Sequence, residues 1–231
     1  MDPPRQEGAG DERLFLPADA GLSSLREAAR GCRGCPLWER GTQTVFGSGQ
    51  VGAEIMLVGE QPGSEEDLTG TPFVGPAGRL LDAALHSAGI DRRRTHVTNA
   101  VKHFKWERRG KRRIHQKPSA SEIRACSPWL RAEIAAVRPG AILCMGASAA
   151  QALLGRGFKV TKRRGELVPC PFAPLAMATV HPSSILRAPD DEARRGEMAR
   201  FVRDLRALRE AVEANEGSEK WRGPEEAKGR T

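Results

Sequence analysis

The segment Glu54-Ile-Met-Leu-Val-Gly59-Glu-Gln-Pro-Gly63 joins a short apolar run to a sharp polar loop. The run has the length and aliphatic content of a buried strand, and the strand must end before Pro62 because proline has no N–H to donate. A helical pattern follows, with Gly75-Pro76 at its start, an apolar stripe over residues 80–85 and Gly89 at its end. The segment therefore predicts a strand that leads through a loop into a helix.

The same alternation of strand and helix recurs along the chain. Further strands are expected over residues 95–101, 141–145 and 175–180, with helical patterns between them. Four such strands predict a single-domain α/β fold, with a central four-stranded parallel sheet and helices on both faces. We place this domain at residues 21–212. The flanking residues 1–20 and 213–231 are expected to be a disordered N-terminal segment and a polar, mobile tail.

Polar side chains stand at the ends of three of these strands: Glu60 and Gln61, Asn99, and His181. Alone, each has an ordinary explanation, as a solvated loop acid, a turn former or a structural histidine. In open α/β sheets, however, ligands bind at the carboxyl ends of the strands. Four polar residues at equivalent ends therefore predict one binding cleft.

A strongly basic segment lies between the second strand and a helix start at Ser119. Residues 102–117 hold eight Lys or Arg and one acidic residue, in a chain of net charge +8 and pI of about 9.7. This charge, with Phe104 and Trp106 near the start of the segment, favours a nucleic acid partner over a membrane. The ordinary reading is a solvated loop that grips phosphates. The motifs described below give its single histidine, His115, a further role.

The chain has no run of about 20 apolar residues that would span a bilayer. Its first residues, Met1-Asp-Pro-Pro, also lack the apolar core of a secretion signal. We therefore expect a cytoplasmic protein with no membrane partner. Five cysteines in such a chain argue against a disulfide framework and for metal-binding, catalytic or buried thiols.

The cysteines fall in different contexts. Cys32 and Cys35 form a Cys-x-x-Cys pair on a turn rich in glycine and proline, which suits a metal or cluster site, a redox pair or two unrelated thiols. Cys126 lies on the apolar face of a helical pattern. It is either a core thiol or, because Pro128 follows closely, a residue at a helix entrance. Cys144, inside an apolar strand, reads as a buried and inert thiol.

Five motifs resemble those of the X-type uracil-DNA glycosylases (UdgX), relatives of the iron-sulfur family-four enzymes. They are Gly59-Glu-Gln-Pro-Gly63, Pro72-Phe-Val-Gly-Pro-Ala-Gly78, Thr98-Asn-Ala-Val-Lys-His103, Lys111-Arg-Arg-Ile-His115 and His181-Pro-Ser-Ser184. The resemblance covers about residues 25–210 in the same order. The Lys-Arg-Arg-Ile-His motif is the most discriminating, because it looks like the insertion that separates this type from ordinary family-four enzymes.

The resemblance implies a uracil-DNA glycosylase fold and the removal of uracil from DNA, followed by covalent capture of C1′ of the sugar by His115. The other catalytic residues that it implies are Glu60 in the first loop, His181 facing the leaving base, and Arg113 supporting the histidine loop. The residues expected to contact the substrate are Gln61, Gly63, Phe73, Asn99, Ser183 and Ser184. Phe73 is expected to stack on uracil and Asn99 to read its polar edge.

One position departs from the pattern: Ser64 stands where an aspartate is expected, so a side-chain role there is open. The resemblance also implies a 4Fe-4S cluster held by Cys32, Cys35, His103 and Cys126. An all-cysteine set with Cys144 in place of His103 is the alternative. Three Cys and one His suit a tetrahedral zinc ion equally well.

The partner implied is uracil-containing DNA, especially single-stranded DNA, bound by a monomer. Two other functions stay open at this point. One is a conventional iron-sulfur glycosylase that uses water and turns over many times, and the other is a non-catalytic iron-sulfur module that binds single-stranded DNA.

Overall fold

Six strands form one mixed sheet in the order β1-β3-β2-β6-β8-β7 in a computed structural model that describes residues 16–17 and 21–216. The predictions for residues 1–15, 18–20 and 217–231 lie outside the described residues. The inner strands β3 (Thr95–Asn99), β2 (Ile55–Gly59), β6 (Ala141–Met145) and β8 (Ala173–Thr179) are parallel. This confirms the α/β fold and its four parallel strands.

The sheet is two strands wider than expected, because antiparallel strands cover both edges. These are β1 (Ser48–Gly49), paired with β3, and β7 (Leu167–Cys170), paired with β8. Neither has a sequence signal of its own, since β1 is two residues long and β7 contains Pro169. Proline is tolerated in edge strands, where an unpaired position needs no N–H.

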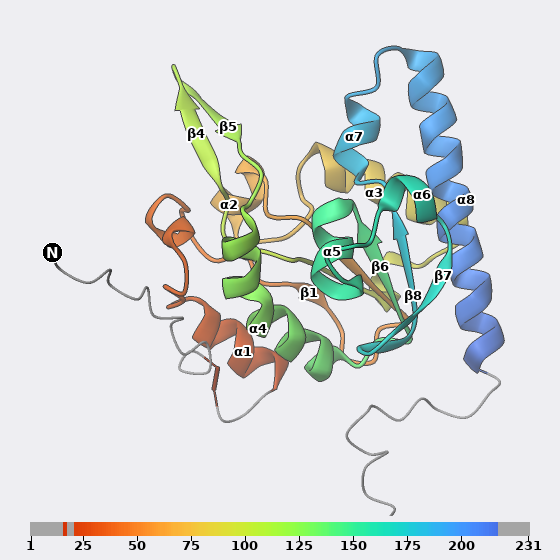
Figure 1. Cartoon of the computed structure of the whole chain (residues 1–231), viewed down its shortest axis with the longest axis horizontal. Helices are drawn as coiled ribbons and strands as arrows, with labels where there is room; N and C mark the ends of the chain where they lie inside the picture. The colour runs from red at the N-terminus through yellow and green to blue at the C-terminus, as the bar shows by residue number, and fades with distance from the viewer. Residues whose placement is uncertain (1–15, 18–20, 217–231) are drawn as a thin grey trace, which may run out of the picture.

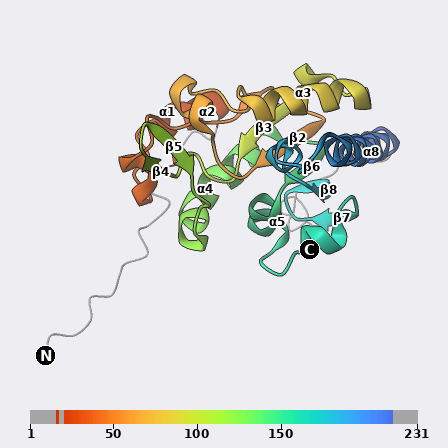
Figure 2. The same ribbon diagram turned by 90° about the horizontal axis from the view of Figure 1, so that it is seen from above.

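Alternation along the central strands builds a core on each face of the sheet. Ile55 and Leu57 of β2 pack with α3 (Pro76–Ala88), α7 (Pro182–Leu186) and α8 (Asp191–Glu216). Met56 and Val58 face α4 (Ala120–Val137) and α5 (Ala147–Leu154). Figure 2 shows α3 on one side of the sheet and α4 and α5 on the other. Helix α8 continues to Glu216, into the segment expected to be a tail.

The shorter elements connect these layers. They are α1 (Leu22–Ala29), η2 (Pro36–Glu39), α2 (Ser64–Thr69), η3 (Arg92–Arg94) and α6 (Val160–Arg163). Among the described residues, no helix combines the length and the apolar character needed to cross a membrane.

Helix α4 begins where the sequence predicts, with a capping box between Ser119 and Glu122. Cys126 lies inside this helix, so the prediction of a helix entrance was wrong. Pro128 removes one backbone hydrogen bond. The helix continues through it because Trp129 and Leu130, which follow the proline directly, are buried and hold it in place.

The basic segment is a β-hairpin rather than an irregular loop. Strands β4 (Trp106–Arg109) and β5 (Arg112–His115) pair in antiparallel fashion, with Trp106 opposite His115. Gly110 has φ 60°, which suits the first position of a two-residue hairpin turn. The hairpin projects beyond the sheet on the same side as α7 (Figure 1).

Candidate active site

A cavity of about 700 Å³ lies at the carboxyl ends of the central strands, between the hairpin base and α7. The predicted site residues that line it are Glu60, Gln61, Gly63, Phe73, Asn99, His115, His181 and Ser183. Arg113 and Ser184 do not line it. Ser184 is exposed, and its hydroxyl donates to the carbonyl oxygen of His181 at 2.8 Å. The rule that ligands bind at the carboxyl ends of parallel strands (the strand-end rule) therefore located this cleft, and the hairpin adds His115 to its wall.

Asn99 and Phe73 meet over Gly59 at one end of the cleft. The side-chain oxygen Oδ1 of Asn99 is buried and has no hydrogen-bond partner among the described residues. A Cβ at Gly59 would lie 2.4 Å from this oxygen and 2.7 Å from Cζ of Phe73, so only glycine fits. Phe73 has a positive φ of 57°, an unusual conformation for a bulky residue that is often found at functional sites. The cleft thus presents an aromatic ring beside an unsatisfied acceptor.

His181 stands opposite Phe73, with ring centroids 5.9 Å apart. Its Nδ1 accepts the backbone N–H of Ser183 at 3.1 Å, so in the neutral ring the proton is on Nε2. Burial, reinforced by the nearby charges of Arg187 and His115, lowers the pKa of His181 to about 4. The ring is therefore a neutral hydrogen-bond donor at physiological pH.

Glu60 lies between a serine and the hairpin histidine. The hydroxyl of Ser148 donates to Oε2 of Glu60, while Oε1 lies 3.5 Å from Nε2 of His115. Ser148, in the first turn of α5, was missed by sequence reasoning. It follows closely on strand β6, so the strand-end rule applied to that strand would have drawn attention to it.

The pKa of His115 lies below the ordinary histidine value, mainly because the ring is partly buried. The carboxylate of Glu60 opposes this shift, and the guanidinium of Arg187 adds to it. This cation lies just after α7 and also lines the cleft.

Arg113 anchors the hairpin to the body of the protein. Its guanidinium donates to Oδ2 of buried Asp67 at 2.5 Å, and to the carbonyl and hydroxyl oxygens of Ser64 at 2.9 and 2.8 Å. It also lies over the rings of Phe104 and Trp106. Ser64, which stands where the motif is expected to carry aspartate, thus contacts Arg113 through its side chain. The carboxylate that pairs with Arg113 is that of Asp67.

Gln61 holds the two ends of the hairpin together. Its Oε1 accepts the backbone N–H of Lys105 at 3.0 Å, and its Nε2 donates to the carbonyl oxygens of Lys105 and Gln116 at 3.2 and 2.9 Å. These bonds occupy the side-chain amide. The side chain therefore acts on the position of the hairpin, although the residue forms part of the cleft wall.

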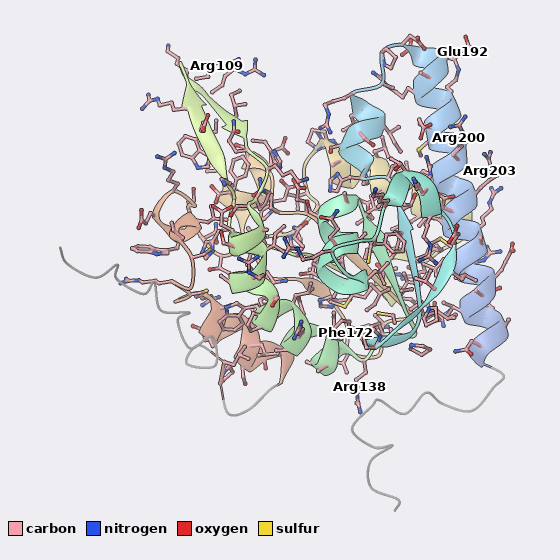
Figure 3. All side chains as sticks on the ribbon, in the orientation of Figure 1. Arg109, Arg138, Phe172, Glu192, Arg200 and Arg203 are labelled. Carbon is pink, nitrogen blue, oxygen red and sulfur yellow. The ribbon has the colours of Figure 1, made fainter. Side chains whose placement is uncertain are left out.

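The basic residues of the segment separate into two groups. Arg108, Arg109, Lys111 and Arg112 are exposed on the hairpin, and Figure 3 shows Arg109 at its tip. Lys102 is fully buried, so its inclusion in a DNA-facing surface was wrong. It lies just beyond the end of β3, where three hydrogen bonds hold its ammonium inside the protein.

Three of the predicted cluster ligands come together between α1, η2 and α4. Cys32, Cys35 and Cys126 belong to one packed cluster, in which the indole N–H of Trp129 donates to Sγ of Cys32 at 3.2 Å. Burial raises the pKa of Cys126 to about 12, and the other two thiols contribute in the same direction. Within the described part of the chain, no group of three or more His, Cys, Asp or Glu is arranged around a single ion.

His103 has one ring nitrogen committed. The hydroxyl of Thr44 donates its proton to the carbonyl oxygen of Ala29 at 2.8 Å, so it must accept from Nε2 of His103, which lies 3.1 Å away. In the neutral ring Nδ1 is then free of a proton, as a metal ligand requires. Cys144 packs in a different core cluster from these thiols, the one that includes α5.

Comparison with known proteins gives consistent matches. The family model described as Uracil DNA glycosylase superfamily matches residues 46–206. A type-4 uracil-DNA glycosylase of Thermotoga maritima is 36% identical over 175 residues, 75% of this chain and 88% of that protein. The type-4 enzyme of Pyrobaculum aerophilum is 35% identical over 191 residues, 80% and 91% of the two chains. A type-5 uracil-DNA glycosylase of the same organism is 30% identical over 148 residues, 58% and 62% of the two chains.

Proposed function

The chain belongs to the uracil-DNA glycosylase superfamily, and on that premise we propose that it excises uracil from DNA and captures the sugar covalently through His115. The capture is the property that the motif resemblance to the X-type enzymes implies. The observation that carries it is the position of His115 in the cleft wall, 3.5 Å from Glu60 and among the residues suited to hold a base.

The cleft end formed by Asn99 and Phe73 suits uracil. Uracil offers an N3–H donor beside an O4 acceptor, which an amide side chain can match with its oxygen and nitrogen. The unpartnered Oδ1 of Asn99 is the acceptor that such a donor would satisfy. Phe73 supplies an aromatic face for stacking. Because a paired base cannot reach this site, the substrate is single-stranded DNA or a nucleotide flipped out of the duplex.

Excision breaks the bond between C1′ and N1 of uracil, and its electron pair leaves with the base. His181 can donate from Nε2 to the developing negative charge on uracil, because its Nδ1 is already an acceptor. The carboxylate of Glu60, oriented by Ser148, favours the positive charge that develops on the sugar. These groups suit a dissociative cleavage with the protein supplying fixed charges and dipoles.

Capture then forms a bond between a ring nitrogen of His115 and C1′. The electron pair of that nitrogen fills the vacancy left by uracil, and the ring becomes a cation that must lose its remaining N–H proton. The carboxylate of Glu60 can accept that proton, because its Oε1 lies 3.5 Å from Nε2. Burial and Arg187 lower the pKa of His115 and so favour the neutral, nucleophilic ring. Once deprotonated, a bonded imidazole is a poor leaving group, so the adduct should persist and the protein should act at most once.

We further propose that Cys32, Cys35, His103 and Cys126 hold a 4Fe-4S cluster. The donor set fits in chemistry, since three thiols group together and His103 can offer an unprotonated Nδ1. Such a cluster would join α1 and η2 to α4 and to the segment that follows β3. Visible absorption of the purified protein tests this, because a colourless, zinc-loaded protein after anaerobic expression would overturn the assignment.

The test of the function is incubation with a uracil-containing single-stranded oligonucleotide, followed by heating in detergent and gel electrophoresis. The wild type should give a shifted band, with one uracil released per protein and no band with thymine. His115→Ala should lose the band and still release uracil, because cleavage relies on His181 and Glu60. His86→Ala, a change at an exposed histidine of α3, is the matched control and should keep the band. Release of many uracils per protein without an adduct would show that water is the acceptor, and no release would reduce the protein to a DNA-binding module.

A further inference from the structure

Lys102 is a fully buried lysine whose three ammonium protons are all committed. Its Nζ donates to Oγ1 of Thr98 at 2.6 Å, to the main-chain carbonyl oxygen of Asn99 at 2.9 Å and to Oε2 of Glu133 at 2.6 Å. An ammonium has three donors, so none is left for DNA or substrate. The charge of this residue therefore acts inside the protein.

The same residue contacts the group of thiols through its main chain. The backbone N–H of Lys102 donates to Sγ of Cys126 at 3.2 Å. Lys102 thus touches a proposed cluster ligand at one end and, at the other, the main chain of the residue that faces the base. It joins these two places directly.

The partner of Lys102 is also fully buried and shared with strand β3. Glu133 of α4 accepts from Lys102 and from Thr98, and its Oε1 lies 3.0 Å from Nε2 of His96. A buried ion pair adds little net stability, because replacing it with apolar residues of similar size often leaves a protein as stable or more stable. The presence of this pair next to Asn99 therefore points to a role in holding that residue in place.

We propose that Lys102 is a positioning residue for uracil recognition. By holding the carbonyl oxygen of Asn99, it fixes the strand end from which the Asn99 amide reaches the cleft with its unpartnered Oδ1. Through its own N–H it ties that strand end to Cys126, so the thiol site and the base-reading site share one support. The inference rests on the proposed uracil recognition, and it does not depend on capture by His115.

The alternative is that Lys102 serves only as the counter-ion of Glu133. A double variant separates the two roles. Lys102→Met/Glu133→Leu removes both charges together, so no buried charge is left unpaired, but it also removes the hydrogen bond to Asn99. If the apolar pair does not fold, as judged by thermal unfolding, Lys102→Gln/Glu133→Gln keeps both positions polar and neutral and takes its place.

The readout is a ratio of two affinities. The first is the affinity for single-stranded DNA that carries 2′-fluoro-deoxyuridine, whose glycosidic bond resists cleavage. The second is the affinity for the same DNA with a tetrahydrofuran abasic analogue at that position. We expect the double variant to lose about tenfold in this ratio, equivalent to about 1.4 kcal/mol, with unchanged affinity for the abasic analogue. The backbone N–H at position 102 remains, so visible absorption should be retained. Lys105→Met/Glu122→Gln removes a neighbouring, more exposed ion pair of 2.9 Å and should leave the ratio unchanged.

Combination with Asn99→Ala completes the test. If Lys102 acts through Asn99, the Lys102 and Glu133 changes should have no further effect on the ratio once the amide is gone. A folded double variant with the wild-type ratio would overturn the proposal, as would an additive effect with Asn99→Ala or a loss of visible absorption. A wild type that prefers uracil but forms no adduct would refute capture by His115 and leave the result for Lys102 standing.

Discussion

Gly59→Ala is the smallest change that should disable the base-binding end of the cleft. The added methyl carbon would lie 2.7 Å from Cζ of Phe73 and 2.4 Å from Oδ1 of Asn99. Carbon atoms in good contact are about 3.5–4.0 Å apart. Either the two side chains or the strand itself must therefore move by about 1 Å to relieve both contacts.

Phe73 has little freedom to retreat. Its main chain is held in a left-handed conformation, and its carbonyl oxygen packs so closely on Gly78 that a Cβ there would be 1.7 Å away. Asn99 is buried at the end of β3, with its carbonyl oxygen held by Lys102. The displacement should therefore fall on the groups that stack on the base and read its edge.

Misplacement of a substrate-positioning group by about 1 Å can cost about a hundredfold in rate. We expect a loss of that size in uracil release, equivalent to about 2.7 kcal/mol of transition-state stabilisation at about 1.36 kcal/mol per tenfold. Overpacking a strand should also lower the free energy of unfolding by about 1–3 kcal/mol. The protein should still fold and bind the abasic analogue normally.

The assay is single-turnover release of uracil, with protein in excess over a uracil-containing single strand, alongside urea unfolding of each variant. Gly157→Ala is the control, because a Cβ at that position meets no atom within 4 Å. A Gly59→Ala variant that releases uracil at the wild-type rate would refute the placement of the base between Asn99 and Phe73. An equal loss in Gly157→Ala would show that the effect is not specific to the cleft.

Three further predictions follow from the hairpin, the thiols and His181. Changing Arg108, Arg109 and Lys111 to Glu should make the slope of log affinity against log salt shallower, by roughly 0.7 for each phosphate of a single strand that the variant no longer neutralises, and an unchanged slope would place the DNA elsewhere. Cys126→Ser should abolish visible absorption, because Cys126 is a ligand in both proposed sets. Cys144→Ser should retain it, because Cys144 packs in the other core cluster, and loss of absorption in Cys144→Ser would favour the all-cysteine ligand set. His181 has a folded-state pKa of about 4 and an ordinary value of 6.5, so the unfolded chain takes up its proton first as the pH falls. The free energy of unfolding should therefore fall as the pH is lowered from 6.5 to about 4. Urea unfolding of His181→Gln should show a smaller fall over this range, and the same pH dependence in both proteins would contradict the buried, neutral ring.

Most of the fold could be predicted because its signals are local. The strand over residues 55–59 shows itself as an apolar run closed by glycine and proline, and the capping box at Ser119 marks the start of α4. The edge strands β1 and β7 could not be predicted, since both are short and pair only because a sheet edge is available. Pro128 was misleading because the packing of α4 outweighs the local preference that proline imposes on its neighbour.

The cleft itself could also be predicted in outline. Parallel strands present their carboxyl ends at one edge, so Glu60, Asn99 and His181 were expected to share one cleft, and all three line it. His115 was expected in the site only through its motif, because nothing local indicates that a hairpin will place it beside Glu60.

The sequence by itself therefore determined the parallel sheet, the edge that carries the site and the residue types gathered there. Only the tertiary structure decided which groups act on one another: Ser148 on Glu60, Arg187 on His115, Arg113 on Asp67 and Lys102 on Asn99 and Glu133. The physical reason is the distance along the chain over which each kind of interaction acts. Strand and helix signals depend on neighbours within a few residues, whereas most of these contacts join elements far apart in the chain, and their strength depends on burial that only the packed layers provide.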